Sequence, residues 1–200
     1  MFYRSERLFL RPAWPEDWKA LLGGISNQEV VCNLATAPWP YDAQSAHDFL
    51  AKPQDPAHPN FLLTRPGAQG STVVGMCGLG AGSDNRLELG YWIARPYWGR
   101  GFATEAAKAV LEIARMLGHQ QIVAGHYLDN PASGKVLRKV GFVPTGRVEA
   151  SYCLARKSNV ECAFYTCDLA SGDLVRSDLA MNDLTAGSLA PREYMPKRAA

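Results

Sequence analysis

The chain has 200 residues, of which 47% are hydrophobic and 20% are charged, as in an ordinary soluble globular protein. Its net charge of +2 is too small to indicate nucleic acid or an anionic membrane surface as a partner. No apolar run is long enough to span a bilayer or to form the core of a signal peptide, and the four histidines lack metal-ligand spacing. The five cysteines include no Cys-x-x-Cys pair, which favours reduced thiols in a cytoplasmic compartment.

The part of the chain before residue 60 predicts short elements separated by proline-rich loops. Residues 8–11 are apolar and follow a charged start, so a strand is expected there, ended by Pro12. Asp42 is suited to cap a helix, because its side chain can accept a hydrogen bond from a first-turn N–H group. Helices are expected at residues 15–22, 27–34 and 43–50.

The middle of the chain predicts an antiparallel meander followed by a long helix. Short polar turns join three apolar strands, at residues 61–64, 72–79 and 87–94. A helix is expected over residues 102–117, because Ala106, Val110 and Ile113 fall on one face. Gly118 is suited to end this helix.

A strand at residues 121–125 completes a strand–helix–strand unit, which predicts that it lies parallel to strand 87–94. Another helix begins with Asn130 as its cap, and two strands follow, at 142–154 and 159–169. The expected fold is therefore α/β (α+β), with a mixed, mostly antiparallel sheet of six or seven strands flanked by helices. Residues 1–170 form one domain in this interpretation, and residues 171–200 form an irregular C-terminal extension.

A glycine-rich turn, residues 99–104, joins strand 87–94 to the long helix. Gly99 and Gly101 permit a tight turn, and the first N–H groups of the helix have no partners inside it. Together with the positive end of the helix dipole they form an anion site, and Arg100 adds a positive charge. The turn therefore predicts a phosphate-binding site.

The succession of these segments resembles the GNAT acetyltransferases, and among them the RimJ/RimL type, which acetylates N-terminal α-amino groups of ribosomal proteins. The resemblance covers residues 5–169. Trp98 stands where the broad pattern has Gln or Arg, a feature of the RimJ/RimL variant. The segments that carry it are Glu6-Arg7-Leu8-Phe9-Leu10-Arg11, Leu87-Glu88-Leu89-Gly90-Tyr91-Trp92-Ile93, residues 98–106, Asn130-Pro131-Ala132-Ser133 and Lys139-Val140-Gly141-Phe142.

The resemblance implies acetyl-CoA as co-substrate. Its pyrophosphate would lie on the N–H groups of the turn, and its pantetheine arm would pair with strand 87–94 as an added strand. A bulge around residues 89–91, with Gly90 as the permissive residue, would supply N–H groups for the thioester oxygen. The expected cofactor contacts are Tyr91, Trp92, Ile93, Gly99, Arg100, Gly101, Phe102, Ala103, Thr104, Asn130 and Ser133.

Two residues are candidates for catalysis. Glu88 could take the amine proton through a water, or could instead face solvent as an ordinary strand residue. Ser133, or Tyr127 in its place, could protonate the leaving thiolate. The alternative for Ser133 is a first-turn hydroxyl bonded to the backbone, or to the cofactor without proton transfer. His126 could act in catalysis, because histidine titrates near neutrality, or could simply be packed or solvated at a strand end. Trp39 could line the groove for the acceptor, or form a minor core under its loop.

The acceptor implied by the resemblance is a primary amine, above all a protein N-terminal α-amino group. The alternatives are a small-molecule amine, such as an antibiotic, polyamine or amino acid, and a non-catalytic acyl-CoA-binding module. An acidic groove would favour a cationic small molecule. A dinucleotide-binding unit would need a third glycine where Thr104 stands. A homodimer is an open alternative for the assembly, with no nucleic acid or membrane partner.

Overall fold

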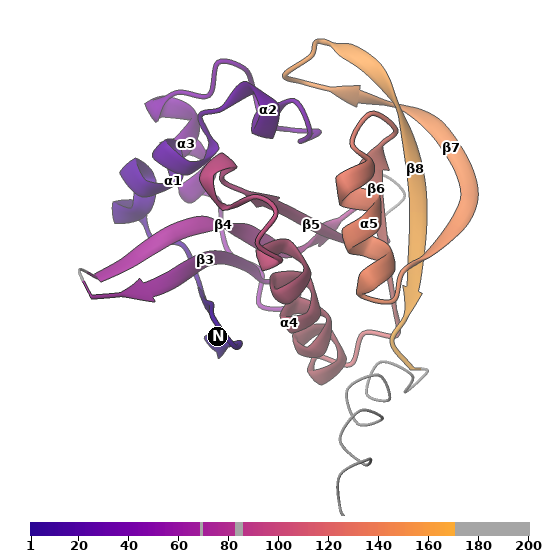
Figure 1. Ribbon diagram of the computed structural model, residues 1–200, viewed down its shortest axis with the longest axis horizontal. Helices are drawn as coiled ribbons and strands as arrows, with labels where there is room; N and C mark the ends of the chain where they lie inside the picture. The colour runs from indigo at the N-terminus through magenta and orange to yellow at the C-terminus, as the bar shows by residue number, and fades with distance from the viewer. Residues whose placement is uncertain (69, 83–85, 171–200) are drawn as a thin grey trace, which may run out of the picture. The chain divides into compact units, whose positions relative to one another are not determined.

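The computed structural model describes residues 1–68, 70–82 and 86–170, so the extension expected at 171–200 lies outside the described residues. Eight strands form one sheet in the order β1-β2-β3-β4-β5-β6-β8-β7 (Figure 1). This confirms the expected mixed, mostly antiparallel α/β fold, with more strands than expected. The strands are β1 (Tyr3–Arg4), β2 (Phe9–Arg11), β3 (Asn60–Gly67), β4 (Gly70–Ala81), β5 (Leu87–Ile93), β6 (Gln121–Tyr127), β7 (Val143–Cys153) and β8 (Ser158–Asp168).

The helices follow the predicted order, and the two predicted N-caps are present, but α1 continues through Gly23 and Gly24 to Ile25 and does not end at residue 22 as expected. Asp42 accepts a hydrogen bond from the Ser45 N–H at the start of α3, and Asn130 accepts one from the Ser133 N–H at the start of α5. None of the described helices is long and apolar enough to cross a membrane. The helices are α1 (Trp18–Ile25), α2 (Gln28–Val31), α3 (Ala43–Leu50), α4 (Phe102–Met116) and α5 (Pro131–Lys139), with short 3₁₀ turns η1 (Pro15–Asp17) and η2 (Arg95–Tyr97).

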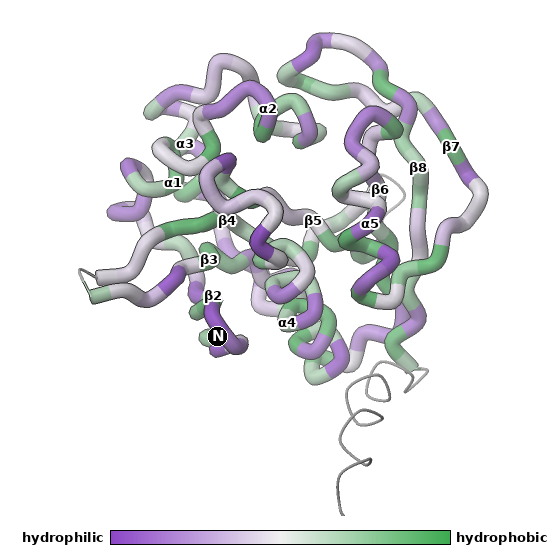
Figure 2. The backbone as a smooth tube through the Cα atoms, viewed as in Figure 1, coloured by the Kyte–Doolittle hydropathy of each residue, from purple (hydrophilic) through white to green (hydrophobic). Residues whose placement is uncertain are grey.

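Helices pack on both faces of the sheet, and each face has its own hydrophobic cluster. The α4 and α5 face buries Val110 and Leu137, whereas the face under α1, α2 and α3 buries Leu21, Met76 and Trp92. Figure 2 shows hydrophobic and hydrophilic segments alternating along α4, as expected of a helix with one buried face. The sheet therefore separates two helical layers, each with its own hydrophobic cluster.

The sheet contains a fork between β5 and β6. These two neighbouring strands are parallel, as predicted, but in the described strands their pairing is confined to one position, Glu88 opposite Val123. The pairs on either side are continuous, because every residue of β5 pairs with β4 and every residue of β6 pairs with β8. Beyond Glu88 and Val123 the two halves of the sheet therefore part.

The bulge expected around residues 89–91 is absent between β4 and β5, and that expectation was wrong. The pairing runs without a register shift from Leu87 opposite Ala81 to Ile93 opposite Gly75. Gly90 lies opposite Gly78 in a regular ladder. A side chain at Gly78 would collide with Asn60, since an added Cβ would lie 2.2 Å from the Asn60 Oδ1 atom. The glycine at 78 is therefore explained by close strand packing.

Candidate active site

The fork presents backbone hydrogen-bonding groups to a ligand. The N–H of Ala94, which follows β5, donates to Val74 O, so the even-numbered residues of β5 bond to β4. The odd-numbered residues, among them Tyr91 and Ile93, therefore direct their N–H and C=O groups toward β6. Past the single Glu88–Val123 pair these groups line the fork. An extended chain of amides can pair with such an edge.

The turn that follows β5 has the geometry of an anion site. Gly99 and Gly101 have φ angles of 73° and 80°, in the left-handed region that glycine adopts without strain. Gly101 caps α4, and the first hydrogen bond of the helix runs from the Glu105 N–H to Gly101 O. The preceding N–H groups of the helix, at Phe102, Ala103 and Thr104, therefore point out of its end.

Side chains hold this turn in place. The Trp98 Nε1–H donates to Ile93 O at 2.6 Å, which ties the turn back to the end of β5. Phe102 is 4% exposed and packs edge-on against Tyr97. Phe102 thus contributes a backbone N–H to the turn while its ring anchors α4 in the core.

Tyr91 and Ser133, which the sequence predicts to share a site, are in contact. The Tyr91 Oη lies 2.7 Å from Ser133 Oγ and donates to Ser133 O at 3.1 Å, so the pair connects β5 to the first turn of α5. Burial raises the pKa of Tyr91 well above its usual range, and the hydrogen bond with Ser133 offsets only part of this rise. Tyr91 is therefore a neutral hydroxyl at physiological pH.

Glu88 lies on the other face of the sheet, at the base of the fork. Alternate residues of a strand point to the same face, so Glu88 faces the same side as Trp92, which packs under α1. Tyr91 packs on the opposite side, with α4. The Glu88 side chain leans toward Gly82, where an added Cβ would lie 3.0 Å from Glu88 Oε2. Its negative charge also contributes to the raised pKa of the Cys162 thiol, after burial, which is the larger cause. The structure therefore places Glu88 and Ser133 on opposite sides of the fork.

Several residues considered from the sequence lie away from the fork. Trp92 directs its backbone groups to β4 and packs its ring beneath Gly24. His126 packs under α5, with Nδ1 2.8 Å from Tyr127 O and Nε2 3.3 Å from Tyr165 Oη. The Tyr127 side chain is buried with Cys153 and Cys162, and its hydroxyl has no hydrogen-bond partner among the described residues. Trp39 packs against the hydrophobic cluster under α1, α2 and α3.

A cleft of about 510 Å³ opens where the ends of β5 and β6 face α2. Trp98 and Asn130 line it from the two strand ends, and Cys32 lies on the α2 side. Glu29, Asp129 and Arg156 also line the cleft. Asp129 and Arg156 form an ion pair at 2.5 Å, and Glu29 pairs at 2.8 Å with Arg95, which lies outside the lining. Sequence analysis missed all four charged residues, because each pair joins segments that are distant in the chain.

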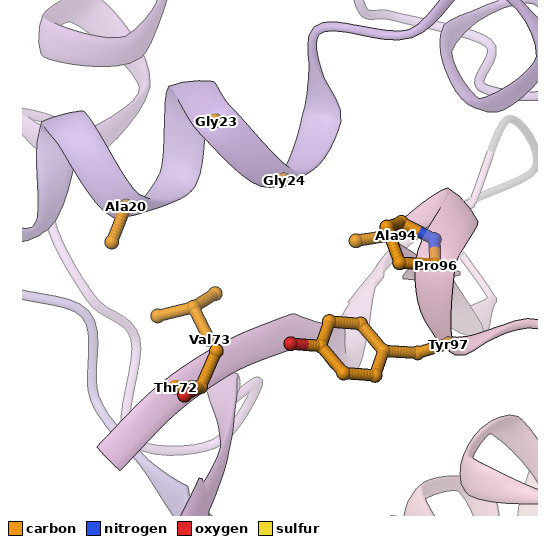
Figure 3. A pocket seen from close by; sticks show the side chains of 8 residues that line it. All are labelled: Ala20, Gly23, Gly24, Thr72, Val73, Ala94, Pro96 and Tyr97. Carbon is orange, nitrogen blue, oxygen red and sulfur yellow. The ribbon is translucent and has the colours of Figure 1, made fainter. Parts of the chain in front are cut away.

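A second hollow, of about 290 Å³, lies between α1, β4 and η2. Its walls are mostly small apolar residues, with Thr72 and Tyr97 as the exceptions, and Figure 3 shows the Tyr97 hydroxyl pointing toward β4. None of the residues predicted to bind the cofactor or to act in catalysis lines it. The predicted site residues therefore lie outside this hollow.

Comparison with protein families identifies this arrangement. A family model described as an acetyltransferase (GNAT) domain matches residues 7–143, which is more than half of the chain. The chain belongs to the GNAT acetyltransferase family. It is therefore an acyl-CoA-dependent N-acetyltransferase, and the GNAT enzymes take their acetyl group from acetyl-CoA.

Individual GNAT proteins resemble this chain over most of its length. "Uncharacterized N-acetyltransferase p20" of Bacillus licheniformis is 28% identical over 150 residues, which are 71% of this chain and 82% of that protein. A GNAT-family acetyltransferase structure from Bacillus anthracis superposes with a TM-score of 0.72 at 20% identity, covering 85% of this chain and 99% of the other. At this identity the structural likeness supports the fold alone.

Two further structures with this GNAT fold are known under more specific names. The microcin C7 self-immunity acetyltransferase, in complex with acetyl-CoA and AMP, has a TM-score of 0.68 at 14% identity, covering 82% of this chain and 93% of the other. A Vibrio cholerae protein, provisionally named a ribosomal-protein-serine acetyltransferase, has a TM-score of 0.65 at 18% identity, covering 84% and 97%. At these identities both structures support the fold alone.

Proposed function

We propose that this GNAT enzyme transfers the acetyl group of acetyl-CoA to the N-terminal α-amino group of a protein or peptide, as in the RimJ/RimL type. The observation that carries the choice of acceptor is the charge balance of the cleft beside the fork. Each of its carboxylates, Glu29 and Asp129, is paired with an arginine. A polyamine would be favoured by unbalanced negative charge, whereas a peptide presents amides and at most one ammonium group.

The donor in this proposal lies in the fork. Its pyrophosphate accepts hydrogen bonds from the N–H groups of residues 100–104, with Arg100 and Asn130 beside it. Its pantetheine amides pair with the Tyr91 backbone and the Ile93 N–H, because Ile93 O already accepts the Trp98 indole N–H. The same backbone edge supplies N–H groups to the thioester oxygen as negative charge develops on it. Trp92 makes no direct contact with the donor in this proposal. Its ring packs under α1 and supports β5, the strand that binds the donor.

In this proposal the residues that act in the reaction lie on opposite faces of the sheet. A neutral amine nitrogen attacks the thioester carbonyl carbon, the C–S bond breaks, and the thiolate leaves. Glu88, on the α2 side, takes the surplus amine proton through a water and releases it to solvent. Ser133, on the α5 side, donates a proton to the thiolate and regains one from solvent, so that the products are the amide and the free thiol. An α-amino group has a pKa of about 7.7–8.0, so it needs only a modest base, unlike a lysine amine near 10.4.

A thiol-release assay tests the proposal. Acetyl-CoA is offered with peptides that begin with Ala, Ser, Thr or Met and with a panel of small amines, and Glu88→Gln is compared with the wild type. We expect peptide turnover, and a fall in kcat of about a hundredfold in the variant. Glu16→Gln, an exposed change in η1, is the control and retains full turnover. Turnover of small amines alone would assign the enzyme to a small-molecule acceptor.

We also propose a cytoplasmic setting for this reaction. All five cysteines are free thiols, and four of them are buried. Free buried thiols are usual in reducing compartments.

A further inference from the structure

We propose that Arg7 is a positioning residue for the phosphate-binding turn of residues 99–104, and that it sets how tightly the enzyme holds the phosphate-bearing part of its acyl donor. The inference rests on the proposed function, because it takes the anion bound at the start of α4 to be the donor pyrophosphate. Arg7 lies just before β2 and is separated from Arg100 by 93 positions in the sequence. It does not touch the reacting atoms.

The Arg7 guanidinium contacts both ends of the turn. Its Nη1–H donates to Arg100 O at 3.0 Å, and its Nε–H donates to Glu105 Oε2 at 2.7 Å. Nη2 lies 2.7 Å from the same Glu105 oxygen, and the guanidinium stacks over the Phe102 ring at 4.6 Å. A rigid planar fork is suited to this double contact, which a single ammonium point charge cannot reproduce.

The other end of this contact is itself fixed. Glu105 Oε1 accepts hydrogen bonds from Ser5 Oγ at 2.7 Å, from the Arg7 N–H at 2.7 Å and from the Leu8 N–H at 3.2 Å. Partial burial alone would raise the pKa of Glu105, but these hydrogen bonds and the Arg7 charge outweigh it and lower the pKa. The segment before β2 and the first turn of α4 are therefore held together by an ionised carboxylate.

The contact with Arg100 O determines how the turn faces an anion. In a trans peptide the C=O group and the following N–H group point in opposite directions. Because Arg7 holds Arg100 O toward itself, the N–H of Gly101 is turned to the opposite side. The carbonyl, whose negative end would repel a phosphate, is thus kept away from the site, and one more donor is presented to it.

Comparing kinetics with two acyl donors distinguishes a role of Arg7 in phosphate binding from a general effect of its substitution on folding. Acetyl-CoA carries the pyrophosphate, whereas acetyl-pantetheine has the same thioester without it. Arg7→Lys keeps a cation beside Glu105 but cannot also donate to Arg100 O in the same geometry. Arg4→Met is the matched control, because it removes an exposed positive charge from the neighbouring β1.

For Arg7→Lys we expect the KM for acetyl-CoA to rise about tenfold, the factor of one charge-assisted hydrogen bond, with kcat unchanged. With acetyl-pantetheine the variant and the wild type should be equal, and Arg4→Met should match the wild type with both donors. Equal losses with both donors would overturn the inference, as would an unchanged KM for acetyl-CoA or an equal loss in Arg4→Met.

Calorimetric binding keeps the inference separate from the proposed function. If wild-type protein turns over neither donor with any amine tested, the proposed function fails. The affinities of CoA and pantetheine for wild-type and Arg7→Lys protein then decide the role of Arg7. Weaker CoA binding with unchanged pantetheine binding supports it, and unchanged CoA binding contradicts it.

Discussion

At the scale of single residues, the fork distributes the proposed chemistry over two faces of the sheet. Successive residues of a strand point to opposite faces, so Glu88 and Tyr91, three positions apart, face opposite sides. Tyr91 meets Ser133 on the α5 side, and Glu88 lies at the base of the fork on the α2 side. A base for the entering amine and an acid for the leaving thiolate therefore need not interfere with each other.

Ser133→Ala tests the acid. We expect kcat to fall about a hundredfold with little change in the KM for acetyl-CoA, because the proton transfer is made only in the transition state. Tyr91→Phe should lose about tenfold in kcat, since it removes the hydroxyl that orients Ser133. Steady-state kinetics with a reactive peptide measures both effects.

The control for this experiment is Ser45→Ala. Ser45 is also a first-turn helix serine, and its hydroxyl lies 2.7 Å from the Asp42 carboxylate, so its loss affects a cap but no catalytic group. Its kinetics should match the wild type. A Ser133→Ala enzyme with normal kcat and a raised KM for acetyl-CoA would make Ser133 a binding residue and remove it from proton transfer.

At the scale of elements, the junction between the segment before β2 and the start of α4 is an electrostatic contact. Glu105 is 10% exposed in its side chain and accepts hydrogen bonds from three residues of the N-terminal segment, at positions 5, 7 and 8. A carboxylate in the first turn also interacts favourably with the helix dipole. Because the pKa of Glu105 is lowered on folding, its ionised form stabilises the folded state.

Glu105→Gln should therefore destabilise the protein in a pH-dependent way. The contribution of Glu105 is present above its unfolded pKa, near 4.3, and is lost as the pH falls through the lower folded pKa. We expect a loss of about 2 kcal/mol in the free energy of unfolding at pH 7, and a smaller loss in acid, where the wild type is protonated too. Urea unfolding at neutral and acidic pH measures the difference. An equal loss at both values would refute a charged role.

At the scale of the whole described domain, one arginine joins three parts of the chain. Arg156 lies in the turn between β7 and β8, and its Nε–H donates to Cys32 O after α2 at 2.7 Å. Its other N–H groups bind Asp129, in the turn before α5. The pair with Asp129 lowers the pKa of that carboxyl, chiefly through the hydrogen bonds. The C-terminal hairpin is thus attached to both walls of the cleft.

Arg156→Gln should loosen this attachment. We expect faster amide hydrogen exchange in the turn before α5 and at the end of α2, and a stability loss of about 1–3 kcal/mol, because Cys32 O and Asp129 lose their donors. Arg147→Gln, on the same hairpin, is the control. Its ion pair with Glu149 lies on the surface of one strand, and such pairs contribute little. Exchange confined to the hairpin itself would contradict a role for Arg156 in the cleft.

Local patterns predict the elements of this protein far better than its contacts. The apolar periodicity over residues 102–117 defines α4, and Asn130 followed by Pro131 marks the start of α5, because both signals depend on neighbours within one or two turns. The contact between Arg7 and Glu105 spans 98 positions, and the pair of Glu29 with Arg95 spans 66. No local pattern encodes such pairs.

The failed bulge prediction has the same cause. Gly90 alone indicates an irregular strand, but the partner strand also has a glycine at position 78, and the two lie opposite each other in regular pairing. The collision that a Gly78 side chain would make with Asn60 depends on a third strand. A glycine in a strand can thus reflect a neighbour that the sequence around it does not reveal.

The fork also gives the sheet two strand edges inside the molecule. Exposed strand edges invite pairing with other chains and promote aggregation, and most proteins protect them with charges, bulges or short strands. Here the facing edges of β5 and β6 lie between helices that pack on both faces of the sheet. A strand of another folded protein would have to pass between these helices to pair there, whereas the proposed pantetheine arm is a single narrow chain. The packed helices thus shield the unpaired N–H and C=O groups of these strand edges, which lowers the risk that the protein associates with itself.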